Sequence, residues 1–269
     1  MTRHFALILA AAVAGSVGSV RAQVLQPWRE LAPRGVSLAL LRPSFDGGGT
    51  SALTTINEVG VRWSIGSLVL VGDLPFVNAK VDGASSGALL IGNPFLGIAS
   101  DPAGKFIGEF GVRLPVASIS SLERGFAAFV GLIGDFMDLE AYTEDLLTIR
   151  GTVGYRHRSP SNYGLRVAVR PAYVVPVGNS SGDSELFLDY GIQGGYESQR
   201  ASFGMVFNGR ALVTESGGGI GERTVHEMGV GGSMTFGQFR PGVIIRIPVD
   251  SDLSQSLNYS VGVRLEVAF

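Results

Sequence analysis

The side chains best suited to ionic interactions in this sequence are charged residues that occur singly within long apolar stretches. The nine basic members are Arg62, Arg113, Arg150, Arg156, Arg166, Arg170, Arg210, Arg246 and Arg264, and the six acidic members are Glu58, Asp73, Glu109, Asp189, Glu227 and Glu266. A guanidinium group stays protonated at any working pH, so a surface lined by these residues would attract anions and oppose cations. The charges could instead pair with one another and fill an interior without leaving a path.

Residues suited to acid–base or covalent catalysis are scarce. His157 and Ser159 lie two residues apart in the segment HRSPSN, but Pro160 follows directly and favours a turn. His226 has no obvious catalytic partner in the sequence. The chain contains no cysteine, no zinc-ligand spacing and no phosphate-loop pattern. The sequence therefore predicts that the protein is not an enzyme and that it uses no cofactor and no metal.

The elements that would position the charges are predicted from alternation between apolar and polar residues. Over the last fourteen residues, Ser256 to Phe269, Val261 and Val263 fall on one face, while Arg264 and Glu266 fall on the other. A strand with one apolar and one polar face fits a barrel that stands in lipid around a polar interior. A soluble sandwich also alternates, so this strand alone does not decide between the two.

Twelve such stretches are predicted as strands, and most span 10 to 14 residues. At about 3.3 Å per residue and a tilt of about 40°, such a strand crosses an apolar band of about 25 Å. Tight and long connections alternate along the chain, which places both termini of the chain in the periplasm and requires an even number of strands. The predicted strands are 35–43, 54–65, 67–76, 88–99, 105–118, 144–157, 163–176, 185–197, 201–214, 225–237, 240–249 and 256–269.

Aromatic residues provide a partly independent check on this arrangement. They gather on the outward face at the predicted periplasmic ends of the strands, where amphipathic rings would lie at the level of the lipid headgroups. The predicted girdle consists of Trp63, Phe106, Tyr155, Tyr163, Tyr196, Phe203, Phe236 and Phe269. Strands favour aromatic residues in general, but that preference would not collect them at one end.

One segment, 122–140, follows a helical period in place of alternation. Its apolar residues are Leu122, Phe126, Phe129, Val130, Ile133, Phe136 and Met137, at the spacings of three and four that an amphipathic helix requires. A thirteenth strand here would make the strand number odd. We therefore expect a short helix in the longest external loop, either as a lid or plug over the barrel mouth or with its apolar face on the outer leaflet.

The beginning of the chain and its composition agree with an exported membrane protein. Arg3 and His4 precede an apolar run, and Ala22 ends a plausible cleavage site, so residues 1–22 are predicted as a signal peptide. Residues 23–34 would form a periplasmic N-terminal segment, and 35–269 an outer-membrane β-barrel. Only 16% of the residues are charged, against 45% hydrophobic, as expected for a wall that faces lipid. The net charge of −2 gives no indication of nucleic-acid binding.

Five segments carry a resemblance to a known family. They are IGNPFLGI at 91–98, LFLDYG at 186–191, NGRALVTE at 208–215, RPGVIIRIPVD at 240–250 and VGVRLEVAF at 261–269. They resemble the outer-membrane family named for a MetA pathway of phenol degradation, and the match would cover most of the mature chain. The resemblance implies a β-barrel in the outer membrane, with some members linked to the uptake of aromatic compounds. It implies no catalytic residue.

These observations lead to two alternative functions. The first is an outer-membrane channel for passive uptake of small solutes, aromatic or anionic, with the fifteen charged residues lining the pore. The second is a non-conducting structural, adhesive or receptor barrel that acts through its external loops. Twelve strands lie between the eight that leave room only for side chains and the sixteen that leave a water channel. The expected partners are outer-membrane lipid, an unidentified solute and the barrel assembly machinery, which would read Phe269.

Overall fold

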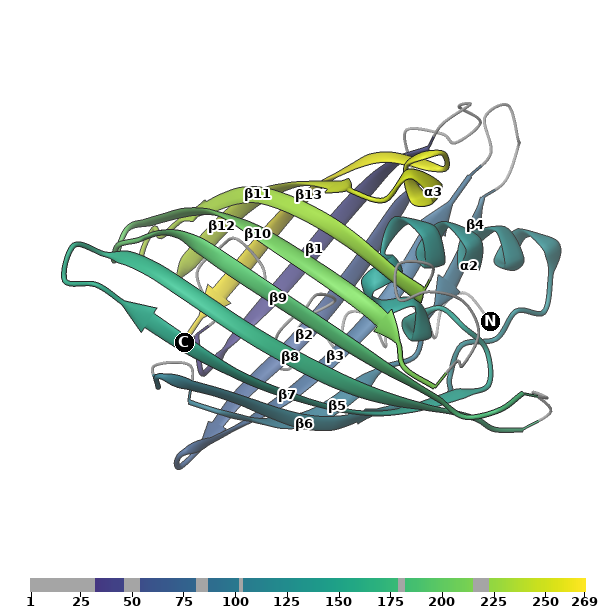
Figure 1. Ribbon diagram of the computed structural model, residues 1–269, viewed down its shortest axis with the longest axis horizontal. Coiled ribbons are helices and arrows are strands. Elements are labelled where there is room, and N and C mark those ends of the chain that lie inside the picture. Colours follow the sequence, from purple (N-terminus) through teal and green to yellow (C-terminus); the bar gives the residue numbers. More distant parts are fainter. Residues whose placement is uncertain (1–31, 46–53, 81–86, 102–103, 179–181, 215–222) are drawn as a thin grey trace.

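The chain folds into a closed antiparallel β-barrel (Figure 1). The structure is a computed structural model that describes residues 32–45, 54–80, 87–101, 104–178, 182–214 and 223–269. The predicted signal peptide, 1–22, and all but the last three residues of the predicted segment 23–34 lie outside the described residues. The strands are β1 (Gly35–Phe45), β2 (Thr55–Ile65), β3 (Leu68–Ala79), β4 (Ala88–Ile91), β5 (Phe95–Ser100), β6 (Phe106–Arg113), β7 (Leu146–Arg158), β8 (Tyr163–Pro176), β9 (Glu185–Glu197), β10 (Ala201–Leu212), β11 (Thr224–Met234), β12 (Phe239–Pro248) and β13 (Leu257–Ala268).

These thirteen strand segments fill twelve positions around the barrel. β1 pairs with both β2 and β13, which closes the ring, and β4 and β5 both pair with β3. The register places Ala88–Ile91 beside Phe76–Ala79, and Phe95–Ala99 beside Val69–Asp73. β4 and β5 are therefore two halves of one interrupted strand, and the prediction of a twelve-stranded barrel is confirmed.

The interruption corrects two predicted strands. The strand expected over 88–99 breaks at residues 92–94, where Pro94 has no N–H to donate. The Gly92 N–H still donates to the Pro75 carbonyl at 2.9 Å, next to the Phe76–Ile91 pair. The strand expected over 105–118 ends at Arg113, since the following chain turns inward. There the Val116 and Ala117 N–H groups both donate to Asn93 Oδ1 at 2.7 Å.

Alternation separates the two faces of the wall. On β13, Val261 and Val263 are exposed on the outward face, while the side chains of Arg264 and Glu266 are buried inside. Most positions of the other strands follow the same rule, so that large apolar side chains cover the outside and most charged ones lie within, with Arg42 of β1 an outward exception. In a soluble protein the apolar side chains lie inside and the charged ones outside. The opposite distribution found here is that of a barrel whose outer surface contacts lipid.

The predicted aromatic residues lie together on the outward face. Ring centroids are 6.1 Å apart for Trp63 and Phe269, and 5.8 Å apart for Phe106 and Tyr155. The ring centroid of Tyr196 lies 5.8 Å from that of Tyr163 and 5.8 Å from that of Phe203. Phe269 ends the chain, and the C-terminus lies at the end of the barrel away from α2 (Figure 1).

The segment expected to be helical forms α2 (Leu122–Gly134) and a 3-10 helix, η1 (Phe136–Ala141). We call Leu122–Ala141 the plug, because its apolar face packs on the inner side of the wall: Val130 belongs to a buried cluster with Leu41 of β1 and Ile56 of β2. The expectation of a lid or plug is therefore correct, and the alternative of a helix lying on the outer leaflet is wrong. A short helix, α3 (Ser251–Ser254), adds one turn to the connection before β13. Within the described residues, no helix is both long and apolar enough to span a membrane.

The outward position of Val263 gives a test of the face assignment. Val263→Arg should lower the free energy of unfolding by about 2–4 kcal/mol in lipid, because it places a charge among acyl chains. Val263→Leu, the matched control, should change it by less than about 1 kcal/mol. Reversible urea unfolding in lipid vesicles measures both values. Equal stability of the two variants would mean that Val263 does not face lipid.

Candidate functional site

Five arginines of the inner wall converge on the plug. They come from five different strands, and four of the five side chains are almost completely shielded from solvent. The five are Arg113 on β6, Arg150 on β7, Arg170 on β8, Arg210 on β10 and Arg246 on β12. Because β6, β7 and β8 are adjacent in the barrel, the first three can surround a single point on the plug.

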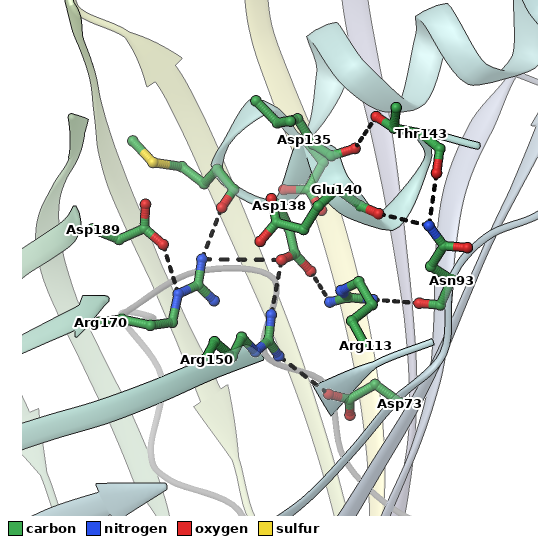
Figure 2. Close-up of polar contacts among 12 residues, drawn as sticks. Asp73, Asn93, Arg113, Asp135, Asp138, Glu140, Thr143, Arg150, Arg170 and Asp189 are labelled. Atoms are coloured by element: carbon green, nitrogen blue, oxygen red, sulfur yellow. Dashed lines mark hydrogen bonds and ion pairs between the residues drawn. The ribbon is translucent and has the colours of Figure 1, made fainter. Parts of the chain in front are cut away.

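That point is the carboxylate of Asp138 (Figure 2). Arg113 Nη2 donates to Asp138 Oδ2, Arg150 Nη1 donates to Oδ1 at 2.8 Å, and Arg170 Nη2 lies 4.0 Å from Oδ1. Asp138 departs from helical geometry inside η1, with φ −138° and ψ 39°. We call Arg113, Arg150 and Arg170 the arginine cradle.

Two further carboxylates fasten the plug beyond the cradle. Glu140 accepts a hydrogen bond from Arg210 Nη2 at 2.8 Å, and Asp135 accepts one from Arg246 Nη1 at 2.9 Å. The Met137 carbonyl accepts from both Arg170 and Arg210 at 2.8 Å. The last turn of the plug is therefore bound to the wall by charge-assisted hydrogen bonds, the stronger class of such bonds.

Asn93, in the gap between β4 and β5, clamps the end of the plug. Its Nδ2 donates to the Glu140 carbonyl at 2.9 Å and to the Thr143 carbonyl at 2.7 Å, as Figure 2 shows. Its backbone N–H donates to the Ala141 carbonyl at 2.7 Å. The break in the strand therefore frees backbone and amide groups to hold a segment that lies inside the barrel.

Two phenylalanine rings support the guanidinium groups from the wall. The Cζ atom of Arg150 lies 3.9 Å from the centroid of the Phe95 ring, and that of Arg210 lies 4.2 Å from the Phe187 centroid. Cation–π contacts at these distances are favourable, and more so when they are desolvated. The rings restrict the orientations that these two arginines can adopt.

The plug changes the charge balance that the sequence predicted for the interior. The wall alone carries nine arginines against six acidic residues away from the rims, but Asp135, Asp138 and Glu140 of the plug add three carboxylates. Nine positive charges then stand against nine negative ones. The expected surplus of positive charge is wrong for the plugged barrel, because the helical segment was assigned to the outside of the lumen.

The pore-lining residues predicted from alternation lie inside the barrel. All are buried except Arg156, which is partly exposed near one rim and donates to the Gly104 carbonyl at 2.8 Å. Arg150 also lies 3.8 Å from Asp73, and Arg246 lies 3.7 Å from Glu227. Two of the predicted residues form ion pairs within the wall. Arg166 pairs with Glu197, and Glu266 lies 3.4 Å from Arg240. Glu58, Arg62, Glu109, Asp189, Arg210 and Arg264 complete the buried set. Whether these residues line a conducting path stays a prediction.

The carbonyl and carboxylate groups of the plug were missed by sequence reasoning. The helical period drew attention to the apolar residues of 122–140, whereas Asp135, Asp138 and Glu140 carry the contacts to the wall. A usable signal was present, since these three acidic residues lie at the C-terminal end of the amphipathic run and equal in number the arginine excess of the strands.

A second polar cluster lies on the outward face near the plugged end. Tyr190 Oη lies 2.7 Å from His226 Nε2, and His226 Nδ1 lies 2.9 Å from Asp250 Oδ1. Gly209 separates Tyr190 from His226 in the sheet register, and its missing side chain lets the Tyr190 ring cross β10. His226 therefore has partners that sequence reasoning did not find. Ser159, by contrast, lies in the β7–β8 turn, where its Oγ accepts from the Tyr163 N–H at 3.1 Å.

Comparison with known proteins identifies the class of fold. No protein-family model and no curated protein matches the chain. An outer-membrane channel from Pseudomonas putida F1 superposes with a TM-score of 0.60 at 10% identity, covering 90% of this chain and 98% of that one. LpxR from Salmonella typhimurium gives a TM-score of 0.50 at 9% identity, covering 87% and 100%. At such identities the likeness establishes the fold alone. The chain has the fold of a bacterial outer-membrane β-barrel.

The environment of Glu140 gives a pH-dependent test of the plug. Burial alone would raise the pKa of the Glu140 carboxyl, but Arg210, Arg170 and Arg113 outweigh it and lower the pKa from 4.5 to about 2. A lowered pKa stabilises the folded state above pH 4.5, and this contribution is lost as the pH falls through 2. Glu140→Gln should therefore be less stable than the wild type by on the order of 3 kcal/mol at pH 7. Urea unfolding at pH 7, 4 and 2 measures the difference, which should shrink only below pH 4.5. A difference that is independent of pH would contradict the assignment.

Proposed function

We propose that this protein is a channel of the bacterial outer membrane for small solutes, and that the plug closes its pathway. The observation that carries the proposal is the attachment of the plug to the inner wall by ionic contacts through Asp135, Asp138 and Glu140. Such contacts can be exchanged for contacts with a solute or with water, whereas strands of the wall cannot leave without opening the barrel. The fold shared with the Pseudomonas putida channel supports the same function.

The chemistry of the interior favours anionic or aromatic solutes. Once the plug carboxylates leave, the wall again presents nine arginines against six acidic residues, and its positive excess raises the local concentration of anions. Phe95 and Phe187 add aromatic surface at the same level. The resemblance of the sequence segments to the phenol-degradation family points to aromatic compounds as well, and it stays a hypothesis because no family model matches.

The proposal includes the partners expected from the sequence. The signal peptide would direct the chain to the periplasm, and the assembly machinery would read Phe269, whose ring is exposed beside Trp63. Outer-membrane lipid would surround the apolar belt. We propose no enzymatic role, no cofactor and no nucleic-acid partner for the chain.

Displacing the plug should open the channel. A Cβ atom at Gly134 would lie 2.5 Å from Ile56 Cδ1 and 3.1 Å from Pro43, so Gly134→Trp should push α2 away from the wall. We expect the mean single-channel conductance in planar bilayers to rise several-fold over the wild type. The control is Gly125→Ala on the same helix, where the added Cβ meets only Ile119 Cγ2 at 3.7 Å.

An absence of conductance in folded protein would contradict the channel proposal. If the wild type and Gly134→Trp both fold into heat-modifiable barrels and neither conducts, the channel proposal is wrong. The non-conducting barrel that acts through its external loops would then be favoured.

A further inference from the structure

We propose that Asp138 occupies the binding site of the transported solute, and that solutes carrying a carboxylate bind the arginine cradle in its place and release the plug. The inference rests on the proposed channel function and names the chemical class of its solute. It makes the plug a ligand of the wall that a solute displaces by competition.

The first support is the number of donors around one carboxylate. Arg113 and Arg150 both hydrogen-bond to Asp138, and Arg170 lies within ion-pair distance. Among the described residues, Arg113 Nε, Arg150 Nε and Arg150 Nη2 meet no hydrogen-bond acceptor. Buried guanidinium donors normally find acceptors, since each one left without costs free energy. The cradle therefore has more donors than Asp138 can use.

The second support is that each arginine has a hold on the wall that does not involve the plug. Arg113 Nη1 donates to the Asn93 carbonyl at 2.5 Å, and Arg170 Nε donates to Asp189 Oδ2 at 2.7 Å. Arg150 stacks over Phe95. These contacts would keep the three guanidinium groups in place after the plug has left, so the cradle is organised before a solute arrives.

The third support is that exchanging one carboxylate for another at the cradle changes the free energy little. Burying an ion pair gains little net free energy, because the Coulomb attraction is offset by the cost of removing both charges from water. Replacing one carboxylate by another leaves both contributions almost unchanged. The exchange then depends on concentration, and a segment tethered by a short linker competes at an effective concentration of the order of millimolar. A carboxylate solute should therefore compete with Asp138 for the cradle at millimolar levels.

The geometry favours a carboxylate over a halide ion. A planar carboxylate can accept two parallel N–H hydrogen bonds from one guanidinium group. A spherical halide ion cannot match this bidentate geometry. Asp138 itself shows that a single carboxylate can meet guanidinium groups from β6 and β7 at once.

The experiment uses the full mature chain in planar bilayers, with benzoate as the probe and benzamide as its uncharged analogue. Benzoate at about 10 mM should raise the open probability of the wild type on the order of ten-fold, and benzamide should leave it unchanged. Arg150→Met should lose most of this response. Arg42→Gln, which removes an exposed arginine from the outward face of β1, should retain it.

A second readout does not depend on conduction. Benzoate should accelerate tryptic cleavage after Arg124, which is exposed at the start of the plug, and benzamide should not. This measurement also serves if Arg150→Met fails to fold.

The outcomes separate the two proposals. Conductance in Gly134→Trp without any effect of benzoate on the wild type would overturn this inference and leave the channel function standing. Inorganic phosphate opening the wild type as effectively as benzoate would overturn the choice of a carboxylate. Folded protein that never conducts, and whose plug is not released by benzoate, would overturn both.

Discussion

The structure depends on the need of buried guanidinium groups for anionic partners. A charge inside a narrow barrel has lost its water and is costly unless it is paired and hydrogen-bonded. Here Arg113, Arg150 and Arg210 lie almost fully buried, and the wall does not supply enough carboxylates for them. The plug supplies three more, and the kink at Asp138 lies where that carboxylate meets Arg113 and Arg150.

The same alternation that buries the arginines makes the outside apolar. Each strand presents one face to lipid and the other to the interior, so the wall can be stable in a membrane while its lumen remains polar. The plug helix α2 occupies the end of the barrel opposite the C-terminus, where the ring of Phe269 contacts Trp63 (Figure 1). Stability in lipid and chemistry in the lumen are thus carried by different residues of the same strands.

Much of this fold could be predicted because the residue patterns that specify its strands and helix lie within short stretches of sequence. Alternation over ten or more residues identified the strands, loop lengths gave their number, and the spacing of Phe126, Val130 and Ile133 identified the helix. The features that were missed depend on contacts between distant residues. Nothing near Asn93 indicates that it binds Glu140 and Thr143, about fifty residues later. The pairing of Tyr190 with His226 likewise requires the barrel register and the gap left by Gly209.

Asp138 and the arginine cradle attach the plug to the wall through their opposite charges. A double-mutant cycle with Asp138→Asn and Arg150→Met tests it most directly, with the opening free energy of the plug taken from hydrogen exchange of the Ala127, Ala128 and Val130 amides. We expect the two substitutions to be coupled by about 1.5 kcal/mol or more. Effects that add to within about 0.5 kcal/mol would contradict it.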